Sequence, residues 1–400
     1  MIEIFSKALN ETIKVDRIIG KLVGKEAGPT VVFYGGIHGN ETAGVFALKK
    51  AFEKINQDSL KGTIYGISGN LKALKENQRF LNHDLNRIWI NGRLETLDTR
   101  KNLSIEENEQ QILFKILQDI LKEEKGPFYF IDLHTTSSKT LPFITINDSL
   151  INRKFSCLFP VPIVLGIEEY LEGPLLSYIN QLGYVSLGFE SGQHDELSAV
   201  TNNEAFIFLS LIHAEALEKR TVPKYEMFLS RLKEASNFEK NIFEITYLYK
   251  LSEDENFVMK PSFKSFQDVK KDEVLAVSNG QEIASPTRAK LFMPLYQKKG
   301  KEGFFIIRRI HPFFLKLSEV LRKIKMDSLL VALPGIRWKD KKEGILRVNL
   351  KVTKYLAKQI FHLFGYRSKQ IDATHVYLFN RERTSKTPSY KNLKWYKKSR

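Results

Sequence analysis

The 400-residue sequence has a single cysteine, Cys157. One thiol cannot form a disulfide within the chain or build a zinc site made of cysteines. The sequence also lacks any uncharged apolar run near the roughly 18 residues that a membrane span requires. Its first residues, MIEIFSKALNETIKVD, lack the basic segment and the following apolar segment of a signal peptide. We therefore expect a cytoplasmic protein with no membrane contact.

Negative charge is scarce at one end of the chain only. The net charge is +16, and residues 321–400 hold 21 Lys or Arg against 5 Asp or Glu, so they carry the whole excess. An electroneutral body with a basic appendage argues against a protein that binds nucleic acid over its whole surface. In the final stretch, SYKNLKWYKKSR, basic and aromatic residues alternate. Such a segment can contact phosphates and stack on bases, or be a solvated face, so contact with a polyanion stays open for this tail.

Three regions follow from the pattern of apolar residues. Residues 1–225 alternate short β-branched or aromatic runs with amphipathic stretches such as residues 105–124. This alternation predicts an α/β domain with helices packed on a sheet. From 240 to 315 the helical period disappears, and short apolar runs between turn residues predict a small β-sandwich domain. Residues 320–400 form a basic C-terminal extension without an assigned role.

Two histidines and one glutamate lie beside predicted strand ends. His38 and Glu41 stand three residues apart in GGIHGNE, directly after one strand, and His134 ends the strand FYFIDLH. In α/β sheets, functional residues gather where the strands end. Two histidines and a carboxylate with an open fourth position form a catalytic zinc pattern. The pair His38 and Glu41 alone is common by chance, and His134 alone is equally compatible with a buried structural histidine. Together they predict one zinc per chain.

Two further carboxylates belong to this prediction. Asp132 precedes His134 by two residues, so on a strand it faces the same side and can orient the imidazole. Glu190 ends the apolar run VSLGFE, where burying a carboxylate is costly without a purpose. The alternatives for Glu190 are a helix cap or an ion pair. The next residues, from His194 to Glu196, look like a solvated loop.

A donor-rich cluster occupies the segment GNLKALKENQRFLNHDLNRIW. Arg79, Asn86 and Arg87 suit an oxyanion and a substrate carboxylate, which arginine binds through two parallel hydrogen bonds. Single loop arginines are more often solvated, so their spacing carries the argument. For His83 we prefer a surface or structural role.

These motifs carry a resemblance. In chain order, they are GGIHGNE, then GN followed by Arg79 and DLNR, then IDLH, and then FESGQ. Their order and spacings are similar to those of the succinylglutamate desuccinylase/aspartoacylase family, a branch of the zinc carboxypeptidase-like hydrolases. The resemblance covers about residues 25–310. It implies a carboxypeptidase-like α/β/α domain with a mixed sheet, followed by a β-sandwich domain.

The resemblance also implies a role for each matching residue. The zinc ligands are His38, Glu41 and His134, the general base is Glu190, the carbonyl-polarising group is Arg79, and the substrate-carboxylate clamp is Asn86 with Arg87. Tyr296 matches a tyrosine that in aspartoacylase reaches the site from the β domain. One family feature is missing: no arginine lies in LLSYINQLGYVSLGFE, where aspartoacylase uses one to recognise aspartate, and Asn180 stands near that point.

The expected activity is hydrolysis of the amide bond of a small N-acyl amino acid. The alternative is a zinc carboxypeptidase that acts on peptide C-termini with the same ligands and a longer cleft. A metal-free relative without activity is disfavoured, because every motif residue that the chemistry needs is present.

Overall fold

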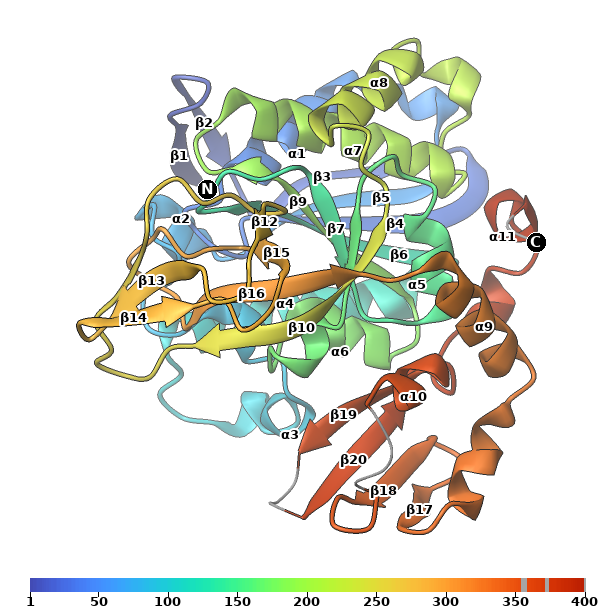
Figure 1. Cartoon of the computed structure of the whole chain (residues 1–400). Coiled ribbons are helices and arrows are strands. Elements are labelled where there is room, and N and C mark those ends of the chain that lie inside the picture. The colour runs from blue at the N-terminus through green and yellow to red at the C-terminus, as the bar shows by residue number, and fades with distance from the viewer. Residues whose placement is uncertain (354–357, 371–373, 399–400) are drawn as a thin grey trace.

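The computed structural model describes residues 1–353, 358–370 and 374–398. Its centre is an 11-stranded mixed sheet, in the order β12-β15-β16-β10-β8-β7-β9-β6-β4-β5-β3, with helices on both faces (Figure 1). Its strands are β3 (Ile18–Val23), β4 (Glu26–Gly35), β5 (Lys61–Ser68), β6 (Phe128–Thr136), β7 (Phe143–Ile146), β8 (Ile163–Leu165), β9 (Val185–Gln193), β10 (Ile242–Lys250), β12 (Asp268–Val269), β15 (Ala289–Phe292) and β16 (Glu302–Arg309). A separate hairpin is formed by β1 (Ile2–Ser6) and β2 (Glu11–Val15).

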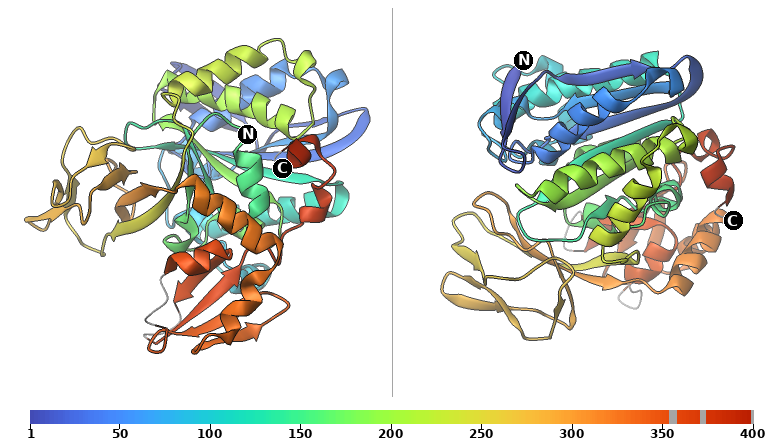
Figure 2. Two further views of the ribbon diagram at one scale, coloured as in Figure 1. Left: turned by 45° about the vertical axis from the view of Figure 1, so that its right-hand side comes forward. Right: turned by 90° about the horizontal axis from the view of Figure 1, so that it is seen from above.

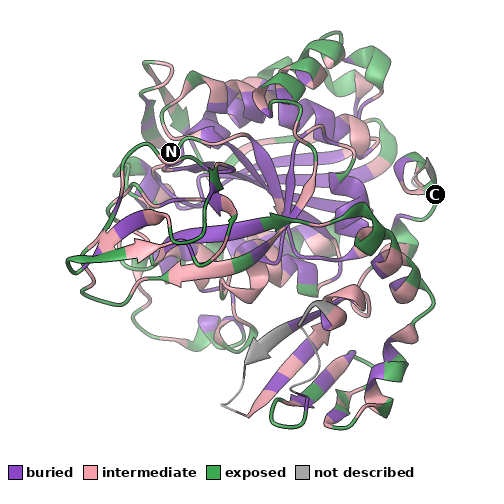
Figure 3. Ribbon diagram, viewed as in Figure 1, coloured by how far each residue is buried: buried purple, intermediate pink, exposed green. Residues whose placement is uncertain are grey.

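Successive side chains of the buried strands pack alternately into two layers of the hydrophobic core. Val31 and Phe33 of β4 pack in one hydrophobic cluster, whereas Val32 and Tyr34 pack in the other. Successive side chains of a strand point to opposite faces, so a strand buried on both faces must be apolar throughout. Figure 3 shows this burial along the central strands. The predicted α/β class with a large mixed sheet is confirmed.

Helices cover both faces of this sheet. They are α1 (Ala43–Lys54), α2 (Leu71–Lys75), α3 (Asn91–Leu94), α4 (Ile105–Glu123), α5 (Leu150–Ser156), α6 (Leu175–Gln181), α7 (Leu197–His213) and α8 (Tyr225–Ala235). The helix predicted over 105–124 is α4, and it begins at a capping box in which Ser104 and Glu107 satisfy each other's backbone N–H groups. Within the described residues, no helix is both long and apolar enough to cross a membrane.

The β region after α8 is continuous with the central sheet. β10 pairs in parallel with β8, where Ile242 lies opposite Ile163, and β16 and β15 follow it in the same sheet. A second sheet of three strands, β11 (Phe257–Met259), β13 (Val274–Ser278) and β14 (Gln281–Ala284), packs on this extension. Figure 2 shows the region projecting from one side of the α/β body. The sequence pattern suggested a separate sandwich because it does not reveal which strands pair.

Most of the C-terminal extension folds into a compact unit, whereas its last helix packs on the α/β body. Its elements are α9 (Pro312–Lys323), β17 (Ile336–Asp340), β18 (Ile345–Asn349), α10 (Lys358–Leu363), β19 (Tyr366–Gln370), β20 (His375–Asn380) and α11 (Lys394–Lys398). The four strands form an antiparallel sheet, in the order β17-β18-β20-β19, with its own small hydrophobic core. Residues 354–357, 371–373 and 399–400 of the expected extension lie outside the described residues.

Two of the three aromatic residues of the tail are buried, and the third, Tyr396, is partly buried. Tyr390 is 0% exposed and Trp395 is 4% exposed. The Tyr390 hydroxyl donates to the carbonyl of Phe128, and Trp395 Nε1 donates to the Tyr129 hydroxyl at 3.0 Å. These rings therefore pack against the body and are not available to stack on bases. Burial of Tyr390 and Trp395 weakens the aromatic half of the argument for a nucleic-acid contact by the tail.

A buried ionic network joins the C-terminal unit to the α/β body. Asp148, which follows β7, accepts hydrogen bonds from Arg153 Nη2 at 2.6 Å, from Arg322 Nη2 at 2.7 Å and from Arg367 Nη2 at 2.8 Å. The side chains of Arg322 and Arg367 are only 0% and 4% exposed. The neighbouring Asn147 lines the cavity described below, so this network reaches the wall of the candidate site.

Candidate active site

The turn between β4 and α1 carries His38 and Glu41. Gly36 in this turn has φ +70°, and a Cβ atom on Gly39 would lie 2.1 Å from the carbonyl carbon of Ala73. Only glycine fits both positions, because a side chain would be strained at the first and would clash at the second. The glycines thus let the chain turn sharply at the strand end, with His38 and Glu41 inside the turn.

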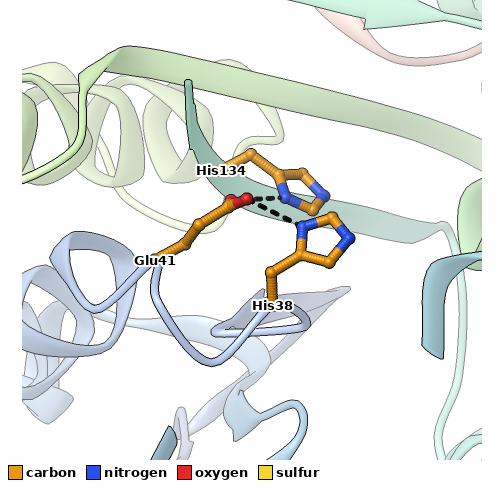
Figure 4. A group of neighbouring side chains, drawn as sticks. All are labelled: His38, Glu41 and His134. Atoms are coloured by element: carbon orange, nitrogen blue, oxygen red, sulfur yellow. Dashed lines mark hydrogen bonds and ion pairs between the residues drawn. The ribbon is translucent and has the colours of Figure 1, made fainter. Parts of the chain in front are cut away.

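Three side chains converge at the carboxyl edge of the sheet. His134, near the end of β6, joins His38 and Glu41, and one ligand atom from each lies within 4.8 Å of the others (Figure 4). His38 Nδ1 is 2.8 Å from Glu41 Oε1, and His134 Nδ1 is 2.9 Å from Glu41 Oε2. All three residues are buried. The structure brings the predicted ligand set together.

A carboxylate holds the outer nitrogen of each imidazole. Asp132 Oδ2 lies 2.7 Å from His134 Nε2, as the sequence prediction requires. Asp84 Oδ1 lies 3.1 Å from His38 Nε2. Such partners fix the ring orientation and leave Nδ1 to face the site. The sequence reasoning missed Asp84, although it belongs to the DLNR motif that was used for its neighbours.

The charges of the site are strongly coupled. Burial alone would raise the pKa of Glu41, but His38 and His134 outweigh it and hold that pKa well below its ordinary value. Burial would lower the pKa of His134, but Asp132 and Glu41 together raise it well above normal. Glu41 is therefore ionised, which is the form in which a carboxylate binds a metal ion.

Glu190 lies on β9 directly beside His134 on β6. It is 8% exposed, and no described residue donates a hydrogen bond to its Oε2 atom. Burial raises the pKa of Glu190 to about 8. Among the described residues, Glu190 makes neither the helix-cap hydrogen bond nor the ion pair considered as alternatives. A buried carboxyl group with an unbonded oxygen is suited to act on a molecule bound in the site.

The donor-rich loop is held in place by α4. Glu106, which is 0% exposed, accepts the backbone N–H groups of Leu81, Asn82 and His83. From this loop, Arg79 Nη1 reaches Glu41 Oε1 at 3.3 Å. No sequence pattern could have identified Glu106, because an acidic residue in the first turn of a helix is ordinary.

One cavity joins these groups. Arg79, Asn86 and Arg87 line it together with the metal-site residues and Glu190. Asn86 Oδ1 accepts the backbone N–H of Leu175 at 2.9 Å, which fixes its side chain. The structure therefore places all three predicted donors at the cavity wall.

Tyr296 requires a correction. It does not line the cavity, and its hydroxyl donates to the carbonyl of Lys260 at 2.7 Å and accepts the N–H of Phe263 at 3.1 Å. The hydroxyl is thus used within the β region, away from the substrate space. The next residue, Gln297, lines the cavity instead.

His194 also differs from its expected place in a solvated loop. Its Nδ1 lies 2.7 Å from the Thr135 hydroxyl, and its Nε2 lies 3.3 Å from Gln297 Oε1. Burial lowers the pKa of His194. The residue therefore supports the cavity wall from behind, next to the strand that carries His134. Its apparent exposure in the sequence came from its polar neighbours Asp195 and Glu196.

Comparisons with known proteins agree with the motifs. Residues 27–201 match the model of the succinylglutamate desuccinylase/aspartoacylase catalytic domain. A probable aspartoacylase of Acaryochloris marina is 32% identical over 170 residues, which is 38% of this chain and 52% of that protein. A probable aspartoacylase of a Nostoc species is 29% identical over 213 residues, or 51% of this chain and 70% of that protein.

A solved structure extends the likeness to the fold. The succinylglutamate desuccinylase/aspartoacylase of Rhodobacter sphaeroides aligns with a TM-score of 0.56 over 72% of this chain and 88% of its own, at 15% identity. At that identity the likeness concerns the fold alone. The sequence match to the Acaryochloris protein spans about half of that protein's length. Family model, sequence relatives and fold agree, and residues 27–201 of this chain form a catalytic domain of the succinylglutamate desuccinylase/aspartoacylase family.

Proposed function

We propose that the protein is a zinc-dependent hydrolase that cleaves the amide bond of a small N-acyl amino acid. The observation that carries this proposal is the cavity in which His38, Glu41 and His134 converge beside the buried carboxyl group of Glu190. Its Oε2 atom has no hydrogen-bond partner among the described residues. Arg79 lines the same cavity. Metal ligands, a base and a cation for an oxyanion are the groups that amide hydrolysis needs.

The donor set fits a zinc ion. Two imidazole nitrogens and one carboxylate, with the outer nitrogens held by Asp84 and Asp132, match the three-ligand sets of catalytic zinc sites. A bound zinc ion would supply Lewis-acid polarisation of the acyl carbonyl and would lower the pKa of a water molecule. Glu41 lies within hydrogen-bond distance of Nδ1 of both histidines, so the three ligand atoms face one another.

The chain's own residues would then move the protons. Glu190 takes a proton from the attacking water as the new C–O bond forms, and delivers it to the nitrogen as the C–N bond breaks. The products are a carboxylate and a free amine, so the proton that Glu190 takes is returned. Arg79, whose guanidinium is buried beside the metal site, stabilises the negative charge that develops on the carbonyl oxygen.

Arg87 and Asn86 stand where a substrate carboxylate can bind. Both line the cavity, and a guanidinium group binds carboxylates with directed, charge-assisted hydrogen bonds. The neutral polar remainder of the wall includes Asn147 and Ser177, which are bonded to each other at 3.1 Å. Apolar side chains complete the wall, so the cavity suits a small substrate with both polar and apolar parts.

A substrate panel tests the proposed function. The zinc-loaded protein should release free amine from N-acetyl and N-succinyl amino acids, with turnover that disappears after chelation. Short peptides with free C-termini, the substrates of a carboxypeptidase, should be cleaved at least tenfold more slowly. Preferential cleavage of the peptides would support the carboxypeptidase alternative, and no cleavage of either group would contradict the proposal.

A further inference from the structure

The proposed carboxylate-binding arginine already has a carboxylate partner within the chain. Glu302, the first residue of β16, accepts hydrogen bonds at Oε1 from Arg87 Nε at 3.3 Å and from Arg87 Nη2 at 3.1 Å. Both residues line the cavity. Their side chains are 23% and 20% exposed, so water screens this pair much less than a surface ion pair.

The other arginine of the cavity is committed in the same way. Arg79 donates to Glu41 Oε1 at 3.3 Å and to Asp84 Oδ2 at 3.2 Å. No lysine lines the cavity in the part of the chain that the structure describes. Outside the metal site, the described residues of the cavity therefore include no cation without a carboxylate partner. A substrate with two or three carboxylates would bring negative charge that these side chains do not balance.

Glu302 keeps one oxygen free for a ligand. Both bonds from Arg87 go to Oε1, and no described residue donates to Oε2. Arg87 Nη1 is bonded only to the carbonyl of Asn86 among the described residues, at 2.9 Å. The pair thus presents the free carboxylate oxygen of Glu302 next to the guanidinium group of Arg87. Side by side, these groups complement a ligand that carries one negative and one positive charge.

We propose that the Arg87–Glu302 pair selects a zwitterionic substrate, an N-acyl diamino acid whose carboxylate binds Arg87 and whose free ammonium group binds Glu302. This proposal rests on the function proposed above. An acidic side chain in place of the ammonium group would face Glu302 at close range, and juxtaposed like charges in a partly desolvated site disfavour binding.

Three substrates of similar length and different charge test this selection. They are Nα-acetyl-L-ornithine, Nα-acetyl-L-glutamine and Nα-acetyl-L-glutamate. For the zinc-loaded wild-type protein we expect the highest kcat/KM for the ornithine derivative, about tenfold or more above the glutamine derivative, and the lowest for the glutamate derivative. Glu302→Gln should abolish the advantage of ornithine over glutamine and improve hydrolysis of the glutamate derivative.

Glu282→Gln is the matched control. Glu282 is an exposed residue of β14 that pairs with Lys260 on the surface at 3.5 Å, so its replacement should keep the wild-type order of substrates. A wild-type preference for the glutamate derivative, unaltered by Glu302→Gln, would overturn the zwitterion proposal and leave the deacylase function standing.

Binding of the product amino acids separates the two proposals if none of the three derivatives is hydrolysed. Calorimetry with L-ornithine and L-glutamate needs no turnover. Tighter binding of ornithine that is lost in Glu302→Gln supports the selection by the pair, even if the hydrolase function fails. Equal binding of both amino acids to the wild-type protein and the variant would overturn it.

Discussion

Replacement of Glu190 by glutamine is expected to lower kcat for amide hydrolysis by about two to four orders of magnitude, the usual contribution of a positioned general base. The amide has nearly the same shape as the carboxyl group but cannot accept the proton of the attacking water. Glu190 is 8% exposed and is not among the three convergent metal-site residues, so its replacement should leave the zinc content unchanged. The measurement is single-substrate kinetics with metal analysis of the same samples.

Glu196→Gln is the matched control for this variant. Glu196 lies just beyond the same strand, and its carboxylate accepts the hydroxyl of Ser198 at 3.0 Å outside the cavity. It should retain wild-type turnover. Wild-type turnover in Glu190→Gln would show that the base lies elsewhere.

The second large effect concerns stability. Asp148→Asn is expected to lower the free energy of unfolding by about 3–5 kcal/mol, because breaking a buried ion pair leaves uncompensated buried charge. Arg322 and Arg367 would lose their shared anionic partner while their side chains stay buried in the joint between the C-terminal unit and the body. Of the ion pairs among the described residues, Arg322 would keep only its contact with Glu382, and Arg367 only its longer contacts with two glutamates of the body. Urea unfolding at pH 7 measures the change. Asp119→Asn, at an exposed site on α4, should change it by less than about 0.5 kcal/mol.

The pH dependence distinguishes charge from shape. Burial alone would raise the pKa of Asp148, but Arg153, Arg322 and Arg367 outweigh it and hold that pKa well below its ordinary value. A depressed folded-state pKa means that Asp148 stabilises the fold above the unfolded pKa of about 4 and loses this contribution as the pH falls below it. The stability gap between wild type and Asp148→Asn should therefore be constant from pH 7 to about 5 and should shrink below about pH 4. A gap that persists unchanged in acid would assign the loss to packing.

The sequence predicted the parts of the site that depend on short-range pattern. His38, Glu41 and His134 each stand at the end of an apolar run, and the rule that strand ends gather at one edge of a sheet is enough to bring them together. Glu190 was found in the same way. The helix over 105–124 followed from its apolar period, which is a local property of the sequence.

Contacts between distant segments could not be predicted in this way. Glu302 lies 215 residues from Arg87, and the letters around it, KKGKEGFF, read as a polar turn before a strand. Tyr296 was placed in the cavity by resemblance, but its side chain turns back to Lys260, and only the fold of the β region determines which of two adjacent residues faces inward.

The C-terminal unit shows the limit of composition as evidence. Its basic residues suggested a solvated or polyanion-binding tail, yet Arg322 and Arg367 serve as buried partners of Asp148. When the charges of residues 321–400 are counted alone, an arginine that pairs with an aspartate elsewhere in the sequence is counted as excess positive charge. The same holds for Trp395, whose ring is buried against Tyr129.

Zinc analysis of the wild-type protein and His134→Ala tests the central claim most directly. The convergence of His38, Glu41 and His134 predicts one zinc ion per wild-type chain and near-complete loss in His134→Ala. His83→Ala, which removes an exposed histidine of the neighbouring loop, should keep the full amount. Stoichiometric zinc in His134→Ala, or none in the wild-type protein after loading, would contradict the proposed metal site.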